Sequence, residues 1–376
     1  MKKENKSVKA YKGFNKYMQC TPNGEIFQYE IGKEYKEDEA NLCHCGFHAC
    51  ENPLDVLSYY NNIDDKFCEV ELDEIDPNRN RDSKICGKKI KIDIEIGFLG
   101  LFKAGIEWIK NKTIFTKEDF KKLPSSDDAK ISSSGNYAQI GSSGYNVQIG
   151  SSGDDAQIGS SGDGAKIGSS GDYAQIGSSG DYVQIGSSGY NVKIGSSGDD
   201  AKISSSGNYA QIGSSGYNVK IGSSGDDAKI GSSSDNAKIG SSGDGAKIGS
   251  SGDYAQIGSS GDYVQIGSSG YNVQIGSSGD YVQIGSFGHN AKIGSSGDDA
   301  KIGSSGDDCV IMCAGINSSA KAKIGSWITL AEWKYSEEKQ KYIPFSVVTK
   351  QVDGIEIKED VYYTLQDGKF KESKQQ

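Results

Sequence analysis

Between residues 129 and 308, small apolar, polar and large apolar positions alternate in a pattern that recurs every nine residues. The unit reads [A/V]-[Q/K]-I-[G/S]-S-[S/F]-[G/S]-x-x and occurs in twenty consecutive copies. Its first three positions have strand periodicity, so Ala/Val and Ile are expected to face inward and Gln/Lys outward. The Gly-Ser segment that follows predicts a bend in which glycine supplies backbone angles that other residues resist, and glycine at this frequency excludes a helix.

One short strand and one turn per nine residues predict a parallel β-solenoid. Two units would close a coil of 18 residues, and three units per coil remain an alternative. The isoleucines should stack into a core ladder, represented by Ile149, Ile158, Ile176, Ile194, Ile212, Ile230, Ile248, Ile266 and Ile284. The expected fold is therefore mainly β, with residues 125–317 forming the solenoid.

The flanking segments have ordinary globular sequences and should cap the two ends. Residues 1–124 are expected to form an α+β head domain, and residues 318–376 a small β cap domain whose strands are joined by Asp-Gly turns. In the head, β-branched and aromatic residues predict strands over 9–14, 26–32 and 66–75. Helices are expected over 51–60, 97–112 and 116–123.

The charge of the chain argues against nucleic acid as a partner. The net charge is −10, and the repeats carry −8 of it as 18 Asp and 10 Lys. An acidic surface repels phosphates, although carboxylate ladders leave mimicry of DNA as an alternative role.

The N-terminal sequence lacks the apolar segment of a secretory signal and no apolar run reaches membrane-spanning length, so we expect a cytoplasmic protein that does not bind membranes.

The variable pair that ends each unit holds the candidate chemistry of the repeats. The spacing is similar to that of calcium-binding nonapeptides, with Asp155, Asp200, Asp227, Asp299 and Asp308 at the ligand position. Most units lack that aspartate, so we do not expect calcium and interpret these corners as solvated. Flat Ser/Gln rows leave ice or polysaccharide binding open. Tyrosines at the corners could form a polyvalent surface for a partner, or they could simply stack on one another. The tyrosines considered for the partner surface are Tyr145, Tyr173, Tyr182, Tyr190, Tyr217, Tyr254, Tyr263 and Tyr271.

Potential metal ligands are concentrated in the head, in the stretch "LCHCGFHACENP". Cys43, Cys45, His48 and Cys50 lie within eight residues, which makes zinc the one cofactor to consider there. The C-x-C spacing is tight and a second ligand pair is missing, so buried structural thiols are the competing interpretation.

The segments "YKGF", "GFHACENPLDVLSYY", "CEVELDEI" and "SKICGKKIKI", with "KIGSWITLAEW" near the C-terminus, resemble an uncharacterised family of phage and prophage proteins. This resemblance implies a mobile-element protein with an accessory role and supplies no activity to carry over, so we expect a non-enzymatic protein in the cytoplasm of a bacterial host. It would bind a host protein and interfere with a host or defence process, and self-association into a homo-oligomer is left open.

The spacing of "YKGF" and "GFHACENPLDVLSYY" is also similar to that of ADP-ribosyltransferase-like folds. That similarity implies an alternative function, an NAD-dependent head carried on a repeat stalk. Its candidate residues would be Tyr11, His48, Tyr59 or Tyr60, and Glu69 or Glu71. An enzyme of this kind should hold Tyr, His and Glu together in one cleft.

Overall fold

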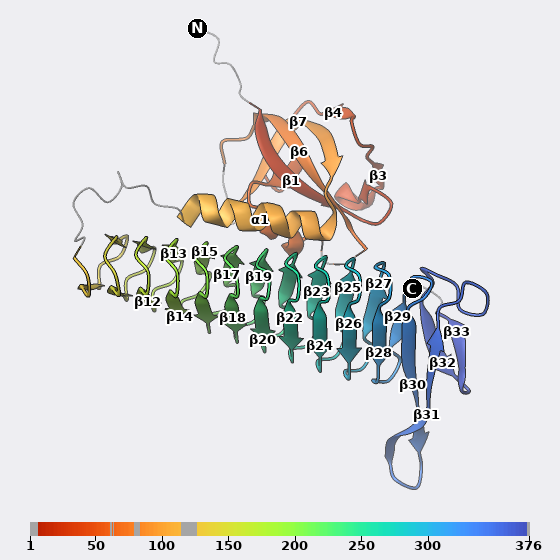
Figure 1. The fold of residues 1–376 in the computed structure, drawn as a ribbon. Helices are drawn as coiled ribbons and strands as arrows, with labels where there is room; N and C mark the ends of the chain where they lie inside the picture. The colour runs from red at the N-terminus through yellow and green to blue at the C-terminus, as the bar shows by residue number, and fades with distance from the viewer. Residues whose placement is uncertain (1–6, 61, 63, 79–82, 114–125, 374–376) are drawn as a thin grey trace. The chain divides into compact units, whose positions relative to one another are not determined.

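The computed structural model describes residues 7–60, 62, 64–78, 83–113 and 126–373 (Figure 1). The chain divides into two units, residues 1–108 and 109–376, and each is described by itself. The prediction of a mainly β fold with a parallel β-solenoid is confirmed, since 46% of the chain is strand and 6% helix. The helix expected over residues 116–123 lies outside the described residues.

The N-terminal unit is a β domain rather than the expected α+β domain. Its five-stranded antiparallel sheet has the order β4-β7-β5-β1-β6, and β7 also pairs with β6, so four of its strands close on themselves. Apolar side chains from these strands, among them Phe14, Phe47, Leu72 and Ile90, form its core. The strands are β1 (Val8–Phe14), β2 (Gln19–Cys20), β3 (Phe27–Gln28), β4 (Glu34–Lys36), β5 (Phe47–Cys50), β6 (Lys66–Ile75) and β7 (Lys84–Glu95).

Two of the predicted elements of this unit differ in the structure. The expected helix over 51–60 is a 3-10 helix, η2 (Pro53–Ser58), because Asn52 caps it at Leu54 N and the chain turns away after six residues. The expected strand over 26–32 is reduced to the two residues of β3. A second 3-10 turn, η1, covers Pro22–Gly24.

The helix predicted over 97–112 is present as α1 (Gly97–Thr113). Its Phe98 ring lies 6.1 Å from the ring of Phe67 on β6. Gly105 approaches Leu54 so closely that a Cβ atom would lie 2.5 Å from the Leu54 side chain. These contacts fix the first part of α1 on the β domain.

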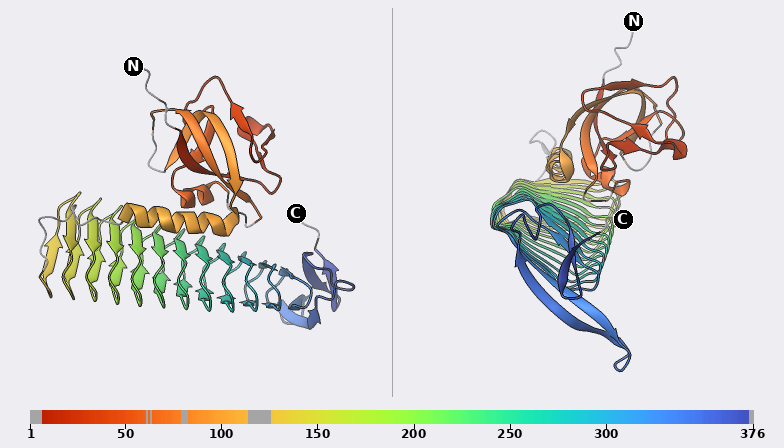
Figure 2. Two further views of the ribbon diagram at one scale, coloured as in Figure 1. Left: turned by 45° about the horizontal axis from the view of Figure 1, so that its top comes forward. Right: turned by 90° about the vertical axis from the view of Figure 1, so that its right-hand side faces the viewer.

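The second unit contains a solenoid of about 11 turns over residues 130–330. Each repeat strand pairs in parallel with the strand 18 residues later, for example Ile149 with Ile167. Two units therefore make one coil, and the three-unit alternative is wrong. Figure 2 shows the successive coils, with one strand of each coil in each of two sheets.

The first sheet takes alternate repeat strands and the second sheet takes the others. The first contains β8 (Lys130–Ser133), β10 (Gln148–Ser151), β12 (Lys166–Ser169), β14 (Gln184–Ser187), β16 (Lys202–Ser205), β18 (Lys220–Ser223), β20 (Lys238–Ser241), β22 (Gln256–Ser259), β24 (Gln274–Ser277), β26 (Lys292–Ser295) and β28 (Val310–Cys313). The second contains β9 (Gln139–Ser142), β11 (Gln157–Ser160), β13 (Gln175–Ser178), β15 (Lys193–Ser196), β17 (Gln211–Ser214), β19 (Lys229–Ser232), β21 (Lys247–Ser250), β23 (Gln265–Ser268), β25 (Gln283–Ser286), β27 (Lys301–Ser304) and β29 (Ser319–Lys321).

The solenoid core consists of the Ala/Val and Ile positions of every coil. The nine isoleucines named above are at most 3% exposed and belong to one hydrophobic cluster. The strand itself begins one residue later than predicted and runs through Gln/Lys-Ile-Gly-Ser, because the Gly-Ser pair continues the coil-to-coil pairing. From Ser142 to Ser304, the serine that ends each repeat strand also points inward and is buried.

The glycine of each turn is explained by the close approach of neighbouring coils. A Cβ atom built on Gly171 would lie 2.0 Å from the carbonyl oxygen of Gly153, and the turn glycines from Gly144 to Gly315 face the same obstacle. The residue with left-handed backbone is instead the second of the variable pair, such as Tyr173 with φ of 58°. We expected these glycines to supply unusual backbone angles, and that expectation is wrong.

The C-terminal strands continue both sheets of the solenoid. β30 (Trp327–Ser336) pairs in parallel with β28 and antiparallel with β31 (Lys341–Gln351). β29 pairs with β32 (Tyr363–Gln366), which forms a hairpin with β33 (Lys369–Glu372) around the Asp367-Gly368 turn. These strands cover the end of the hydrophobic core, where Val352 and Leu365 are buried.

Candidate functional sites

The turns of the solenoid form two edges. We call the turns that follow strands of the first sheet the first edge, and those that follow strands of the second sheet the second edge. At both edges the second residue of the variable pair has φ between 52° and 59° when it is Asp, Asn or Tyr. Asn, Asp and Gly tolerate this left-handed conformation, whereas it is unfavourable for a bulky side chain.

Seven tyrosines nevertheless occupy this left-handed position. Five of them lie on the first edge and two on the second: Tyr137, Tyr173, Tyr209, Tyr263 and Tyr281, then Tyr182 and Tyr254. Six of the seven are between 44% and 76% exposed, so burial of the ring does not compensate for the conformation. Backbone strain that packing does not explain is a mark of functional positions.

The first edge also gathers its tyrosine rings into clusters. The Tyr190 ring lies 5.9 Å from that of Tyr173 and 5.2 Å from that of Tyr209, so three successive coils contribute to one patch. Further along, Tyr263 and Tyr281 stack with centroids 5.0 Å apart. Offset and tilted rings at these distances attract each other, which holds the exposed patch in place.

Three corner tyrosines of these edges, Tyr137, Tyr209 and Tyr281, are absent from the set predicted as partner surface. They occupy the same repeat position as Tyr173 and Tyr263, so the nine-residue alignment could have included them. The remaining predicted members, Tyr145, Tyr217 and Tyr271, take the first corner position on the second edge. Tyr217 and Tyr271 accept hydrogen bonds there from Asn236 and Asn290.

Aspartates at the first corner position bind the next coil rather than standing free in solvent. The Oδ1 atom of Asp154 accepts a hydrogen bond of 3.0 Å from the backbone N–H of Asp172, whose own Oδ1 accepts one of 2.8 Å from Tyr190 N. The same bond recurs on both edges. The interpretation of solvated corners concerned the aspartates of the second corner position; at the first position each such carboxylate satisfies an exposed amide of its neighbour.

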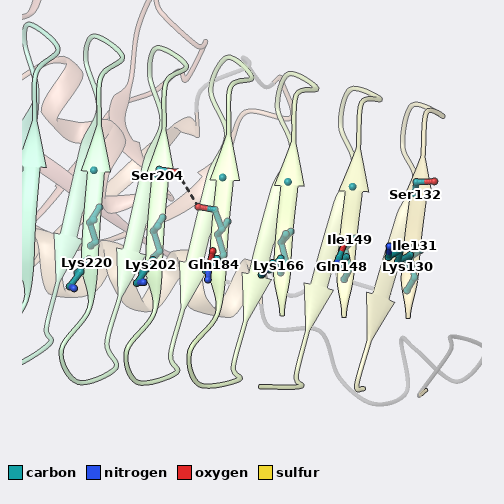
Figure 3. Close-up of a pocket in the computed structure, with 18 residues that line it drawn as sticks. Lys130, Ile131, Ser132, Gln148, Ile149, Lys166, Gln184, Lys202, Ser204 and Lys220 are labelled. Carbon is teal, nitrogen blue, oxygen red and sulfur yellow. Dashed lines mark hydrogen bonds between the residues drawn. The ribbon is translucent and has the colours of Figure 1, made fainter. Parts of the chain in front are cut away.

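The outer face of the first sheet carries a shallow groove along the solenoid. Figure 3 shows its Gln and Lys side chains in a row across successive coils, from Lys130 to Lys220. Beside this row the outward residue of most coils is glycine, and a Cβ atom at Gly150 or Gly168 would meet nothing within 4 Å. The described lining of the groove contains no aromatic side chain.

The N-terminal unit contains a more enclosed cleft of about 370 Å³. Its lining comes from β1, β5, η2 and the start of β7, together with the loop before β5. The polar and aromatic residues that line it are Tyr11, Lys12, Cys43, His48, Cys50, Tyr59, Tyr60 and Lys84. Three tyrosines, two lysines and a histidine therefore face one small volume.

The electrostatic potential in this cleft is positive. Burial and the nearby ammonium groups of Lys12 and Lys84 lower the pKa of His48 to about 4, so its imidazole is neutral at pH 7. The Nε2 atom of His48 accepts a hydrogen bond of 2.9 Å from Cys43 N–H. Burial also raises the pKa of Tyr60, whose hydroxyl donates to Cys20 Sγ at 2.9 Å.

The cleft brings together only some of the residues that the resemblance to ADP-ribosyltransferase-like folds implies. Tyr11, His48, Tyr59 and Tyr60 all line it, but neither Glu69 nor Glu71 is among its described lining residues. Glu69 pairs across the strands with Tyr11, and its carboxylate lies 2.8 Å from Lys9 Nζ. The Tyr-His-Glu cleft expected of an NAD-consuming enzyme is therefore incomplete.

The four residues considered for zinc make separate contacts. Among the described residues, no three His, Cys, Asp or Glu side chains converge as a metal-binding group. Cys50 is buried, and the backbone carbonyl of Cys45 accepts a hydrogen bond from the Cys86 thiol. Zinc binding by Cys43, Cys45, His48 and Cys50 stays a prediction, as does the expected independence from calcium.

In a comparison with known protein families, part of the chain matches a domain family whose function is unknown. The model of a domain of unknown function (DUF7666) matches residues 8–104, which include the β domain and its cleft. No curated protein matches the chain, and no solved structure matches it. Within the described part of the chain, no helix has the length and apolar character needed to cross a membrane.

Proposed function

We propose that this protein is a non-enzymatic interaction scaffold whose solenoid presents the first-edge tyrosines to a host protein. The observation that carries the proposal is the left-handed backbone of the corner tyrosines: five of the seven lie on that edge, and four of those five are exposed. Asparagine occupies the same position in other coils without the steric cost, so a requirement for the aromatic side chain explains the choice.

The clustering of these rings supports a protein as the partner. Tyrosines held beside one another on a rigid surface lose little conformational entropy on binding and are enriched at protein interfaces. The neighbouring corner aspartates give the edge an acidic character, which favours a basic partner surface and disfavours nucleic acid. Following the resemblance to phage and prophage proteins, the partner would be a cytoplasmic bacterial protein involved in a host or defence process.

The test compares two edges of one molecule. In the first-edge variant Tyr173, Tyr190, Tyr209, Tyr263 and Tyr281 are replaced by Asn; in the matched second-edge variant the replaced residues are Tyr145, Tyr182, Tyr217, Tyr254 and Tyr271. Each protein is immobilised, exposed to a bacterial lysate, and its bound proteins are quantified by mass spectrometry.

A partner retained by the native chain and the second-edge variant, but reduced at least tenfold by the first-edge variant, would support the proposal. Circular dichroism must show the same strand content in all three proteins. If both variants retain the partner equally, the first edge is not the binding surface. If both lose the partner equally, the tyrosines of the two edges contribute alike, and the proposal that the first edge is the binding surface is rejected.

A further inference from the structure

The cleft of the N-terminal unit contains a buried ammonium group without a carboxylate partner. Lys12 is 9% exposed, and its Nζ atom donates a hydrogen bond of 2.9 Å to the carbonyl oxygen of His48. The same Nζ lies 5.6 Å and 5.7 Å from the ring centroids of Phe14 and Tyr29. No described Asp or Glu forms an ion pair with it. Burying a charge in this way is costly unless a counter-charge is supplied.

A second lysine, Lys84, lines the same cleft. Lys84 Nζ lies 4.3 Å from the ring centroid of Tyr59 and 3.8 Å from Cys43 Sγ, again without a described carboxylate partner. After burial, the charges of both lysines help to lower the pKa of His48, so both lie near its imidazole. The described lining contains no Asp or Glu that could neutralise them.

The rest of the lining is aromatic. Tyr11, Tyr59 and Tyr60 contribute rings to the walls, and Val56 and Ala49 add apolar surface. A volume of about 370 Å³ lies within the range of small-ligand sites. The cleft therefore offers two positive groups for an anion and flat apolar surface for a planar ring.

We propose that this cleft binds a small phosphorylated aromatic ligand of the mononucleotide class, with its phosphate between Lys12 and Lys84 and its ring among the tyrosines. The phosphate supplies the counter-charge that Lys12 lacks, and stacking on tyrosine tolerates different bases. This site is independent of the solenoid edges, so it adds a ligand to the head without requiring the proposed function to be correct.

The proposal is tested by isothermal titration calorimetry on the full chain at 0.15 M salt with adenosine 5′-monophosphate, adenosine and inorganic phosphate. We expect the monophosphate to bind at least tenfold more tightly than either fragment, because only it engages both lysines and rings. Lys84→Met should weaken it at least tenfold, whereas Lys84→Arg should keep binding within about threefold. Tyr59→Leu should weaken the monophosphate and leave phosphate binding unchanged.

The buried lysine provides a readout that does not depend on the choice of ligand. Lys12→Met removes the uncompensated charge while keeping the volume, so it should raise the melting temperature of the free protein and abolish stabilisation by the monophosphate. No binding of monophosphate or phosphate at millimolar concentration would overturn the proposal. So would unchanged affinity in Lys84→Met, or inorganic phosphate binding as tightly as the monophosphate.

Discussion

The Oδ1 atom of Asp199 accepts a hydrogen bond of 2.7 Å from the backbone N–H of Tyr217, one coil further along the solenoid. This bond continues the coil-to-coil pairing through the turn, where strand hydrogen bonds have ended. Most coils repeat the bond with an Asp, and others use Asn, as Asn208 does for Asp226 N. The repeated aspartate is therefore a structural acceptor as well as a source of negative charge.

Replacing Asp199 tests the contribution of this acceptor. Asp199→Ala should destabilise the solenoid by about 0.5–1.5 kcal/mol, the usual net value of a hydrogen bond that is lost with its partner still exposed to water. Asp199→Asn keeps Oδ1 and should cost less than half as much. Amide hydrogen exchange at Tyr217, measured by NMR or mass spectrometry, should accelerate in the alanine variant alone. Unchanged exchange in both would mean that the bond contributes nothing.

An added methyl group should change the stability of the solenoid in opposite directions at two glycines of the same coil. Gly171→Ala places a Cβ atom 2.0 Å from the carbonyl oxygen of Gly153, so neighbouring coils must separate and about 1–3 kcal/mol is lost. Gly168→Ala meets nothing within 4 Å and should be neutral, or stabilising by up to about 1 kcal/mol, because alanine restricts the unfolded chain. Urea unfolding followed by circular dichroism measures both; equal effects would show that coil contact does not select the turn glycine.

The nine-residue period predicted the solenoid and its core well, since alternation determines which side chains face inward. It could not predict how many units close a coil, because two and three units satisfy the same local pattern. The bond between Asp199 and Tyr217 depends on the 18-residue coil and was therefore missed. In the head, β7 was not predicted although apolar residues such as Ile90 and Ile92 alternate with lysines. The cleft itself could not be predicted from the sequence, because Lys12 and Lys84 lie on strands that are far apart along the chain.

The N-terminal unit should lose stability on mild acidification. The pKa of His48 is about 4 in the folded chain and about 6.5 when unfolded, so between these values the unfolded state binds more protons. The stabilising effect of the neutral imidazole is fully present above pH 6.5 and is lost as the pH falls toward 4. Hydrogen exchange in β5 and β7 should accelerate over this window. His48→Gln keeps an acceptor for Cys43 N–H and should flatten the dependence; an equally steep dependence in that variant would assign it to another group.

The length of the repeat array should be adjustable by whole coils but not by half coils. Deleting residues 228–245 removes β19 and β20, after which β18 can pair with β22 and β17 with β21, each in its original sheet. The coils are about 4.8 Å apart, so this deletion shortens the solenoid by one strand spacing and leaves every core position in place. We expect the variant to keep its strand content by circular dichroism and to melt within a few degrees of the native chain.

Deleting only residues 228–236 moves every later strand to the opposite sheet. The C-terminal strands keep their partners, because β28, β29, β30 and β32 all lie after the cut and move together. New neighbours meet only at the cut, where β20 would stack on β17 and β21 on β18. Both sheets repeat the same nine-residue pattern, so the coils themselves should still stack. The sequence that begins at residue 129 also recurs from residue 201, where residues 228–236 are one additional unit. The damage should therefore concentrate at the cut, where the corner residues of neighbouring coils acquire new partners. The half-coil deletion should melt lower than the whole-coil deletion; the reverse order would show that unit number, and not sheet identity, determines stability.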